Sequence, residues 1–153
     1  LLLHPAYVSG HRLSVYLSTN QEVSTTALLR NAFDAGKLCY VPCFEKGNPQ
    51  MEMVRLASMD DFDALPTTLW NIKQPKDWMK RGLDVIITPG IAFTKSGKRL
   101  GHGKGYYDTY IKRYVETFKT KPQVIGLALK EQILDDLPAD ENDQLMDFVI
   151  YSD

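Results

Sequence analysis

A glycine-rich stretch at residues 89–108 limits most strongly how this chain can fold. The apolar run before it, at 83–88, is rich in β-branched residues and predicts a buried strand. After it, apolar residues recur at three- and four-residue steps from 107 to 119, which predicts an amphipathic helix. The glycines therefore join a strand to the amino end of a helix, and alternation of strands with helices is typical of a parallel α/β sheet.

The position of this stretch favours an anion-binding site. The first amides of a helix have no partner within it, and the helix dipole places partial positive charge there. Gly101, Gly103 and Gly105 lack a Cβ atom, so backbone N–H groups can approach a ligand closely. Arg99 and Lys104 add cationic donors to the same loop, and phosphate is the simplest ligand for this combination.

Asp108 adds a carboxylate beside this predicted phosphate site. A carboxylate repels phosphate unless a cation lies between them, and Mg²⁺ typically binds one or two carboxylates together with phosphate oxygens. The stretch therefore predicts a nucleotide and its metal together. Its spacing matches neither the Walker A loop nor the dinucleotide-binding fingerprint. At this point a flexible glycine loop with solvated charges stays open as the alternative.

Length and composition indicate the broad class of protein. The 153 residues suffice for one domain with a single core. A net charge of −1 gives no general reason to expect nucleic-acid or membrane binding, so any anion site must be local. Cys39 and Cys43 are too few for a disulfide framework, and no apolar run reaches the ~18 residues of a membrane span. We expect a soluble cytoplasmic protein, with mitochondrial residence left open.

The chain in order predicts two strand–helix–strand units. A helix capped by Ser24 and ended by Gly36 joins the first two strands, Pro42 closes the second, and Ser58 caps a short helix. The strands besides 83–88 are predicted at 13–17, 38–41, 51–56, 124–129 and 148–151. We expect a three-layer, mostly parallel, Rossmann-like open sheet with helices on both faces. Its functional site should lie at the carboxyl ends of the strands, where residues 18–22 follow the first one.

The string from Pro89 to Asp108 closely resembles the signature of the 5-formyltetrahydrofolate cyclo-ligase family, also called methenyltetrahydrofolate synthetases. That signature reads roughly P-G-x-[AG]-F-D-x-x-G-x-R-L-G-x-G-x-G-Y-Y-D, and the sequence departs from it at Thr94, where the family pattern has Asp. The similarity covers nearly the whole chain and looks most like the eukaryotic members. Outside the signature it rests on residues 15–18 with Glu22, and on 51–55, 70–72, 130–132 and 141–143.

The resemblance implies a reaction and a domain. The reaction is ATP- and Mg²⁺-dependent cyclisation of 5-formyltetrahydrofolate, with or without a polyglutamate tail, to 5,10-methenyltetrahydrofolate, with release of ADP and phosphate through an imidate phosphate. The fold implied is the same three-layer α/β domain over residues 1–153, and we expect a monomer. In the family an N-terminal helix carries basic residues that reach the ATP phosphates. Residues 1–3 look like the end of a helix and 1–11 offer no such residues, so we expect that helix to be missing from this sequence.

The resemblance also implies site residues, position by position. Arg99 and Lys104 are the predicted catalytic residues. The predicted ATP site consists of Arg99, Leu100, Gly101, His102, Gly103, Lys104, Gly105, Tyr106 and Tyr107. The predicted folate contacts are Leu17, Glu22, Met51, Trp70, His102, Gly103, Lys104, Gly105 and Tyr106. Asp108 and Asp143 are the predicted Mg²⁺ ligands. For Met51 a place in the core is the stronger alternative, and Trp70 suits local packing as well as stacking on the folate.

Two functional alternatives from other classes stay open. One is a sugar-phosphate isomerase-like enzyme on a similar sheet, which would use the glycine loop but needs no pair of metal-binding aspartates. The other is a binder of nucleotide or folate without catalytic activity.

Lys104→Ala tests the predicted catalytic role of this lysine. Because removal of a donor preorganised for the transition state costs roughly 10²–10³-fold in rate, we expect a loss of this size at saturating ATP with little change in stability. Steady-state turnover and thermal unfolding of the variant are the measurements. Near-normal turnover would show that Lys104 is not catalytic.

Overall fold

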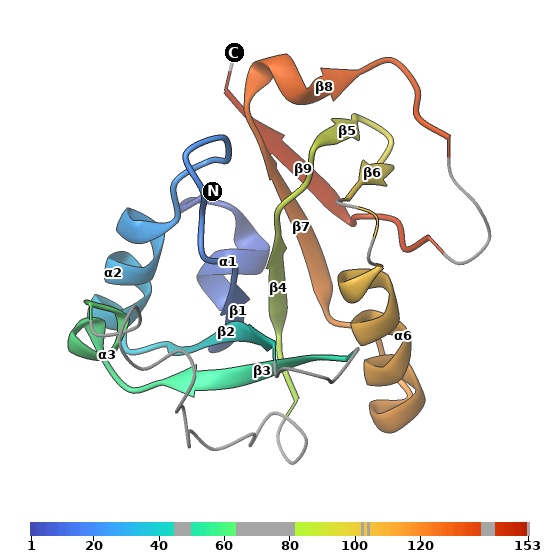
Figure 1. The fold of residues 1–153 in the computed structure, drawn as a ribbon. Helices are drawn as coiled ribbons and strands as arrows, with labels where there is room; N and C mark the ends of the chain where they lie inside the picture. Colours follow the sequence, from blue (N-terminus) through green and yellow to red (C-terminus); the bar gives the residue numbers. More distant parts are fainter. Residues whose placement is uncertain (45–49, 64–81, 102, 104, 139–142, 153) are drawn as a thin grey trace.

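The computed structural model describes residues 1–44, 50–63, 82–101, 103, 105–138 and 143–152 (Figure 1). Its main sheet has the strand order β3-β2-β1-β4-β7-β9. The strands are β1 (Arg12–Val15), β2 (Leu38–Phe44), β3 (Met51–Leu56), β4 (Val85–Thr88), β7 (Gln123–Ala128) and β9 (Phe148–Tyr151). All neighbours pair in parallel except β2 and β3, which are antiparallel. The predicted mostly parallel α/β sheet is confirmed.

Helices cover both faces of this sheet, as Figure 1 shows. On one face lie α1 (Pro5–Ser9), α2 (Thr26–Asp34) and α3 (Met59–Asp63), and on the other lies α6 (Tyr106–Phe118). The alternation of side chains along a strand explains the two apolar layers. In β4, Val85 and Ile87 pack in the cluster that contains α2, whereas Ile86 packs in the cluster that contains α6. Among the described residues, no helix combines the length and the apolar character that a membrane span requires.

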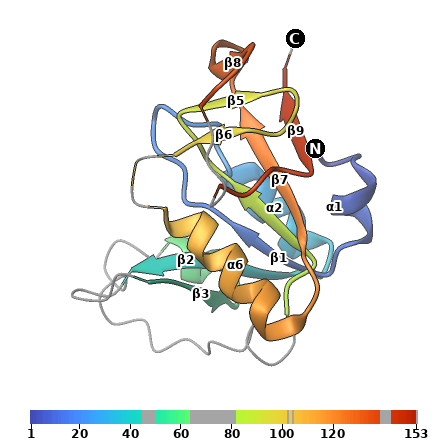
Figure 2. The ribbon, with the colours of Figure 1, turned by 90° about the vertical axis from the view of Figure 1, so that its right-hand side faces the viewer.

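A second, smaller sheet is formed by two strands between β4 and α6, where the sequence suggested only a loop, and by a third strand that follows β7. It has the order β6-β5-β8, with β5 at Ala92–Thr94, β6 at Arg99–Leu100 and β8 at Ile133–Leu134. Figure 2 shows it beside the carboxyl end of β7. The glycine-rich stretch therefore begins with a β-hairpin, and only its second half is a loop that leads into α6.

Three local predictions were wrong. The residue that precedes α2 is Thr25 rather than Ser24, and its hydroxyl donates to the Tyr16 carbonyl at 2.7 Å, which ties the helix to the end of β1. Residues 1–3 form a turn instead of a helix end. β2 continues through Pro42 because its pairing with β1 ends at Tyr40, so Pro42 has a strand partner on one side only, as proline has at a sheet edge.

Two further local predictions are confirmed, and a third concerns residues outside the described ranges. The capping role of Ser58 is confirmed, since its hydroxyl accepts from the Asp61 amide at 3.4 Å and the Asp61 carboxylate accepts from the Ala57 amide at 2.9 Å. Gly36 follows α2 with φ of +75°, the left-handed conformation expected of it. The loop predicted at 66–82 falls, except for Gly82, outside the described residues.

Lys37 joins α1 to the rest of the fold. Its side chain is 9% exposed, and Nζ donates to the carbonyls of Tyr7, Val8 and Gly10 at 2.9, 3.2 and 2.5 Å. Nζ also lies 4.9 Å from the centre of the Tyr7 ring. One ammonium therefore donates to three carbonyls at and just beyond the carboxyl end of α1.

Lys37→Met should lower the free energy of unfolding by about 2–4 kcal/mol, because methionine fills similar space but removes a charged donor from three carbonyls at the end of α1. Urea unfolding followed by circular dichroism measures this loss. Lys112→Met, at an exposed position of α6, is the matched control. Equal stability of the two variants would contradict the role given to Lys37.

Candidate functional site

A cavity of about 630 Å³ lies at the carboxyl ends of β1, β2 and β4. Its walls come from the residues that follow these strands, from β6, from the amino end of α6, and from the segment after β8. A volume of this size falls in the usual range for small-molecule sites, about 300–1,000 Å³. The cavity lies at the carboxyl edge of the parallel strands, where the sequence predicts the functional site.

The topology explains why the cavity forms there. The chain passes from β1 to β2 on one side and from β4 to β7 on the other, so the connections after β1 and β4 diverge. Such a switch point leaves a crevice above two adjacent strands, and ligands of open α/β sheets bind in it. Tyr16 and Leu17, directly after β1, and Pro89, directly after β4, form part of the cavity wall.

The hairpin β5–β6 brings Arg99 to this crevice. Phe93 pairs with Arg99 across the hairpin and is fully buried. Its ring fills the space above two glycines: a Cβ atom would lie 2.5 Å from the ring at Gly126 and 2.7 Å from it at Gly90. The missing side chains let Phe93 pack directly on β7 and on the end of β4, which anchors the hairpin to the main sheet.

The Arg99 guanidinium is a nearly buried cation, with its side chain 7% exposed. Nη1 donates to the Pro89 carbonyl at 3.0 Å, Nη2 lies 4.0 Å from an Asp108 oxygen, and the group lies 5.3 Å from the centre of the Tyr107 ring. Burial lowers the pKa of Arg99 below its ordinary value, while the charge of Asp108 raises it. Since the ordinary pKa of arginine is above 12, the side chain stays charged at neutral pH.

The glycines before α6 open its amino end to the cavity. Gly103 and Gly105 have φ of +90° and +65°, values that residues with side chains rarely adopt, and both line the cavity. Gly105 is the N-cap and offers no side-chain acceptor to the first turn of this 13-residue helix. The amides of the first turn therefore remain for an anion, as predicted from the sequence.

Aromatic side chains form another part of the wall. The rings of Phe44 and Tyr106 lie 4.7 Å apart and both line the cavity. Tyr107, which the sequence placed on the apolar stripe of α6, is 8% exposed in the core and also borders the cavity. Burial raises the pKa of its hydroxyl, which keeps the ring neutral beside Arg99.

Two carboxylates face the same cavity, from Asp108 in the first turn of α6 and from Asp143. Asp108 Oδ1 accepts from the Gln144 amide at 2.9 Å, so the residue after Asp143 is attached directly to the helix. Within the described ranges, no group of three or more histidine, cysteine or acidic side chains could hold a metal ion. Two carboxylates fit Mg²⁺ when a bound phosphate supplies further oxygens, which is its usual mode in nucleotide sites.

The cavity brings most of the predicted site residues together. Those on its wall are Leu17, Glu22, Arg99, Leu100, Gly101, Gly103, Gly105, Tyr106, Tyr107, Asp108 and Asp143. Met51 is different: it is 2% exposed, packs in the core below α6 and is not part of the wall. We therefore remove it from the candidate folate contacts. Trp70, His102 and Lys104 lie outside the described residues, so their roles stay predictions.

Several wall residues were not predicted. They are Tyr16, Pro42, Cys43, Phe44, Pro89 and Pro138. The sequence placed site residues after the first strand only. Because the second strand was predicted to end at Pro42, Cys43 and Phe44 were not expected at the carboxyl end of β2. Glu22, which was predicted, is held by a turn in which its carboxylate accepts from the Thr19 amide at 2.9 Å.

The comparisons with known proteins agree with this geometry. The family model described as "5-formyltetrahydrofolate cyclo-ligase family" matches residues 1–152. The chain belongs to this family. A Mus musculus protein named 5-formyltetrahydrofolate cyclo-ligase is 42% identical over 160 residues, which cover 100% of this chain and 79% of the relative. A Caenorhabditis elegans protein named as a probable 5-formyltetrahydrofolate cyclo-ligase is 44% identical over 153 residues, covering 95% and 74%.

Solved structures of two methenyltetrahydrofolate synthetases share the fold of this chain. The NMR structure of Aquifex aeolicus 5,10-methenyltetrahydrofolate synthetase superposes with a TM-score of 0.70 at 24% identity, covering 99% of this chain and 73% of that one. A synthetase from Mycoplasma pneumoniae gives 0.67 at 20% identity, covering 93% and 73%. At these identities the likeness shows the fold alone.

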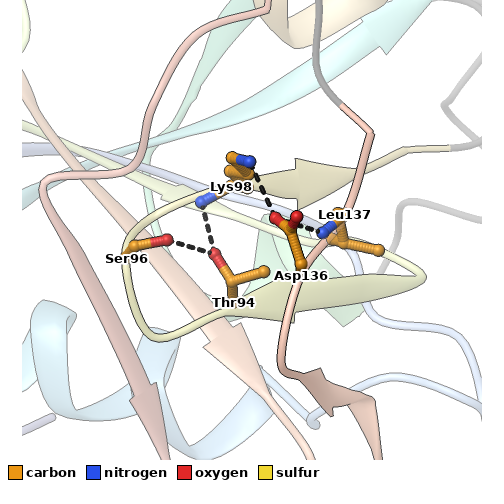
Figure 3. A network of polar contacts seen from close by, with 5 residues as sticks. All are labelled: Thr94, Ser96, Lys98, Asp136 and Leu137. Atoms are coloured by element: carbon orange, nitrogen blue, oxygen red, sulfur yellow. Dashed lines mark hydrogen bonds and ion pairs between the residues drawn. The ribbon is translucent and has the colours of Figure 1, made fainter.

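Thr94, the departure from the family signature, has a structural role in the hairpin turn (Figure 3). Its hydroxyl accepts from the Lys98 amide at 3.0 Å and shares a hydrogen bond with the Ser96 hydroxyl at 2.8 Å. Lys98 Nζ in turn contacts Asp136 at 2.7 Å, and Asp136 accepts from the Leu137 amide. An aspartate can accept the same turn hydrogen bonds, and Thr94 does not line the cavity.

Thr94→Val keeps the shape of the side chain and removes the hydroxyl. We expect the free energy of unfolding to fall by about 1–2 kcal/mol, because the turn loses two part-buried hydrogen bonds. Chemical unfolding measures the loss, with Thr120→Val at an exposed position as the control. If the two variants were equally stable, the turn would not depend on Thr94.

Proposed function

We propose that the protein catalyses ATP- and Mg²⁺-dependent cyclisation of 5-formyltetrahydrofolate to 5,10-methenyltetrahydrofolate, with release of ADP and phosphate. The observation that carries the proposal is the cavity at the switch point, where the α6 amino end, a fixed cation and two carboxylates meet. Membership of the cyclo-ligase family supports the same reaction. In this proposal residues 1–153 act as a single monomeric cyclo-ligase domain of the cytoplasm.

The chemistry of the substrate explains why ATP is required. N10 must attack the carbon of the N5-formyl group, but the formyl oxygen is a poor leaving group. Transfer of the γ-phosphoryl group of ATP to that oxygen breaks the bond to ADP and forms an imidate phosphate. N10 then adds to the formyl carbon and loses its proton to solvent or to the departing phosphate, and the carbon–oxygen bond breaks as phosphate leaves.

The cavity wall divides into parts suited to each reactant. The amides at the start of α6, with Gly103, Gly105 and Arg99, would bind the phosphates, because phosphoryl transfer depends on positioning and on stabilising spread negative charge. Lys104 and His102 are predicted to add to this part from the sequence. Asp108 and Asp143 would hold Mg²⁺, which when bound offsets charge on the phosphate oxygens.

The folate would occupy the part of the cavity nearer to β1 and β2. Leu17 and Glu22 follow β1, and the aromatic pair of Phe44 and Tyr106 offers flat apolar surface for a pterin or benzoyl ring. Holding N10 beside the activated carbon contributes up to ~7–11 kcal/mol in well-oriented systems. A cavity that binds both reactants side by side therefore supplies orientation as well as charge.

A direct assay tests the proposed function. The protein mixed with 5-formyltetrahydrofolate, ATP and Mg²⁺ in mild acid should produce the near-ultraviolet absorbance of methenyltetrahydrofolate, and omission of ATP or chelation of Mg²⁺ should abolish it. Product without ATP, or none from the complete mixture, would contradict the cyclo-ligase activity. Binding of both reactants without product would instead favour the non-catalytic alternative.

Asp108→Asn separates the charge of Asp108 from its structural hydrogen bond. The amide oxygen still accepts from the Gln144 amide, but the negative charge is lost, so we expect kcat/KM for Mg·ATP to fall by about 10²-fold with thermal stability nearly unchanged. Asp108→Ala should lower both. Asp60→Asn, at an exposed position of α3, is the control. Unchanged kinetics of Asp108→Asn over a Mg²⁺ titration would argue against Asp108 as a metal ligand.

A further inference from the structure

Gln132 makes hydrogen bonds through both ends of its side-chain amide. It ends the short 3₁₀ helix η1 (Lys130–Gln132) that follows β7. Nε2 donates to the carbonyls of Gly90 and Ile91 at 2.8 and 3.2 Å, and Oε1 accepts from the Leu129 amide at 2.8 Å. The side chain is half-buried and does not line the cavity. It therefore connects the turn after β7 to the segment after β4.

That segment, residues 89–91, is also what holds Arg99. The Pro89 carbonyl accepts from Arg99 Nη1 at 3.0 Å. The Ile91 amide donates to the Leu100 carbonyl at 2.7 Å, which attaches β6 to the same three residues. Both the guanidinium and the strand that carries it are thus fixed to residues 89–91.

Close packing around Gly90 couples the position of residues 89–91 to the side chains of Phe93 and Arg99. A Cβ atom at Gly90 would lie 2.7 Å from the Phe93 ring and 3.1 Å from Arg99 Cγ, so the backbone there already touches both side chains. If the Gly90 and Ile91 carbonyls moved away from Gln132, the adjacent Pro89 carbonyl would be displaced as well. The Arg99 guanidinium would then lose the hydrogen bond that fixes its position at the cavity wall.

We propose that Gln132 is a positioning residue of the cyclo-ligase reaction, which fixes Arg99 at the cavity by holding the carbonyls of Gly90 and Ile91. Its effect on catalysis rests on the proposed function, whereas its effect on Arg99 does not. Glutamine suits this role because one NH₂ group supplies two donors for two successive carbonyls while the oxygen accepts from a third group. Glutamate would place an oxygen against two carbonyl oxygens, and asparagine is one methylene shorter.

Kinetics of Gln132→Ala and Gln132→Glu test the proposal, with Glu131→Gln at the exposed neighbouring position as the control. Because a misplacement of about 1 Å can cost roughly 10²-fold, we expect kcat/KM for Mg·ATP to fall roughly 10- to 100-fold. The KM for 5-formyltetrahydrofolate should change less than about threefold, because only the phosphate side of the cavity is disturbed. Glu131→Gln should behave as wild type.

A double-mutant cycle with Arg99→Met distinguishes positioning from a general structural role. If Gln132 acts through Arg99, Gln132→Ala should have less than about a twofold effect once Arg99 is gone. Equal effects of Gln132→Ala in both backgrounds would overturn the proposal. Gln132→Asn provides a second variant for the cycle if the alanine variant folds poorly.

A readout that needs no turnover completes the test. The ¹⁵N–¹H signal of Arg99 Nε should shift or broaden in Gln132→Ala and stay in place in Glu131→Gln. An unchanged signal in Gln132→Ala would contradict the proposal. If the wild-type protein forms no product, the proposed function fails, and the NMR result still decides whether Gln132 positions Arg99.

Discussion

The cavity depends on the buried guanidinium of Arg99. This one group contacts the end of β4 through the Pro89 carbonyl, the first turn of α6 through Asp108, and the core through the Tyr107 ring. A buried charge is costly unless it is paired and hydrogen-bonded, so these contacts constrain one another. The hairpin that delivers Arg99 is itself anchored by Phe93 against two glycines. Strand end, hairpin and helix therefore meet at a fixed positive charge, which is what a site for a transferring phosphoryl group requires.

The positive charge of Arg99 also offsets the repulsion between the acidic residues at the cavity. Asp108 lies near Arg99 and accepts from the amide of Gln144, the residue after Asp143, and both aspartates line the cavity. A polyanionic nucleotide beside two carboxylates needs more positive charge than one arginine supplies. The amino end of α6 and a Mg²⁺ ion would provide it, and Lys104 would add to it. Binding of phosphate and of metal should accordingly depend on each other, because each offsets the repulsion that the other would meet.

Much of this arrangement could be predicted from the sequence, because the boundaries of long strands and helices can be read from the spacing of their apolar residues. The predicted strand at 83–88, helix at 107–119 and strand at 124–129 agree with β4, α6 and β7 within about two residues. The hairpin was missed because β5 and β6 are only three and two residues long, too short for any period to show. Met51 lies in the core, which was the stronger of its two interpretations, because apolar alternation tells that a residue faces a layer but not which layer. Cys43 and Phe44 were missed because the pairing of β2 beyond Tyr40, which makes Pro42 acceptable, is a long-range property.

A crystal structure with Mg²⁺, a non-hydrolysable ATP analogue and 5-formyltetrahydrofolate would show whether phosphate and metal bind where Arg99, the amino end of α6 and the two aspartates meet. We expect the terminal phosphate against the first amides of α6 and beside Arg99. The metal should lie between that phosphate and the carboxylates of Asp108 and Asp143, with the formyl oxygen facing the terminal phosphorus. A triphosphate bound elsewhere, with Arg99 still held only by Pro89 and Asp108 and with no metal near the two aspartates, would contradict this expectation.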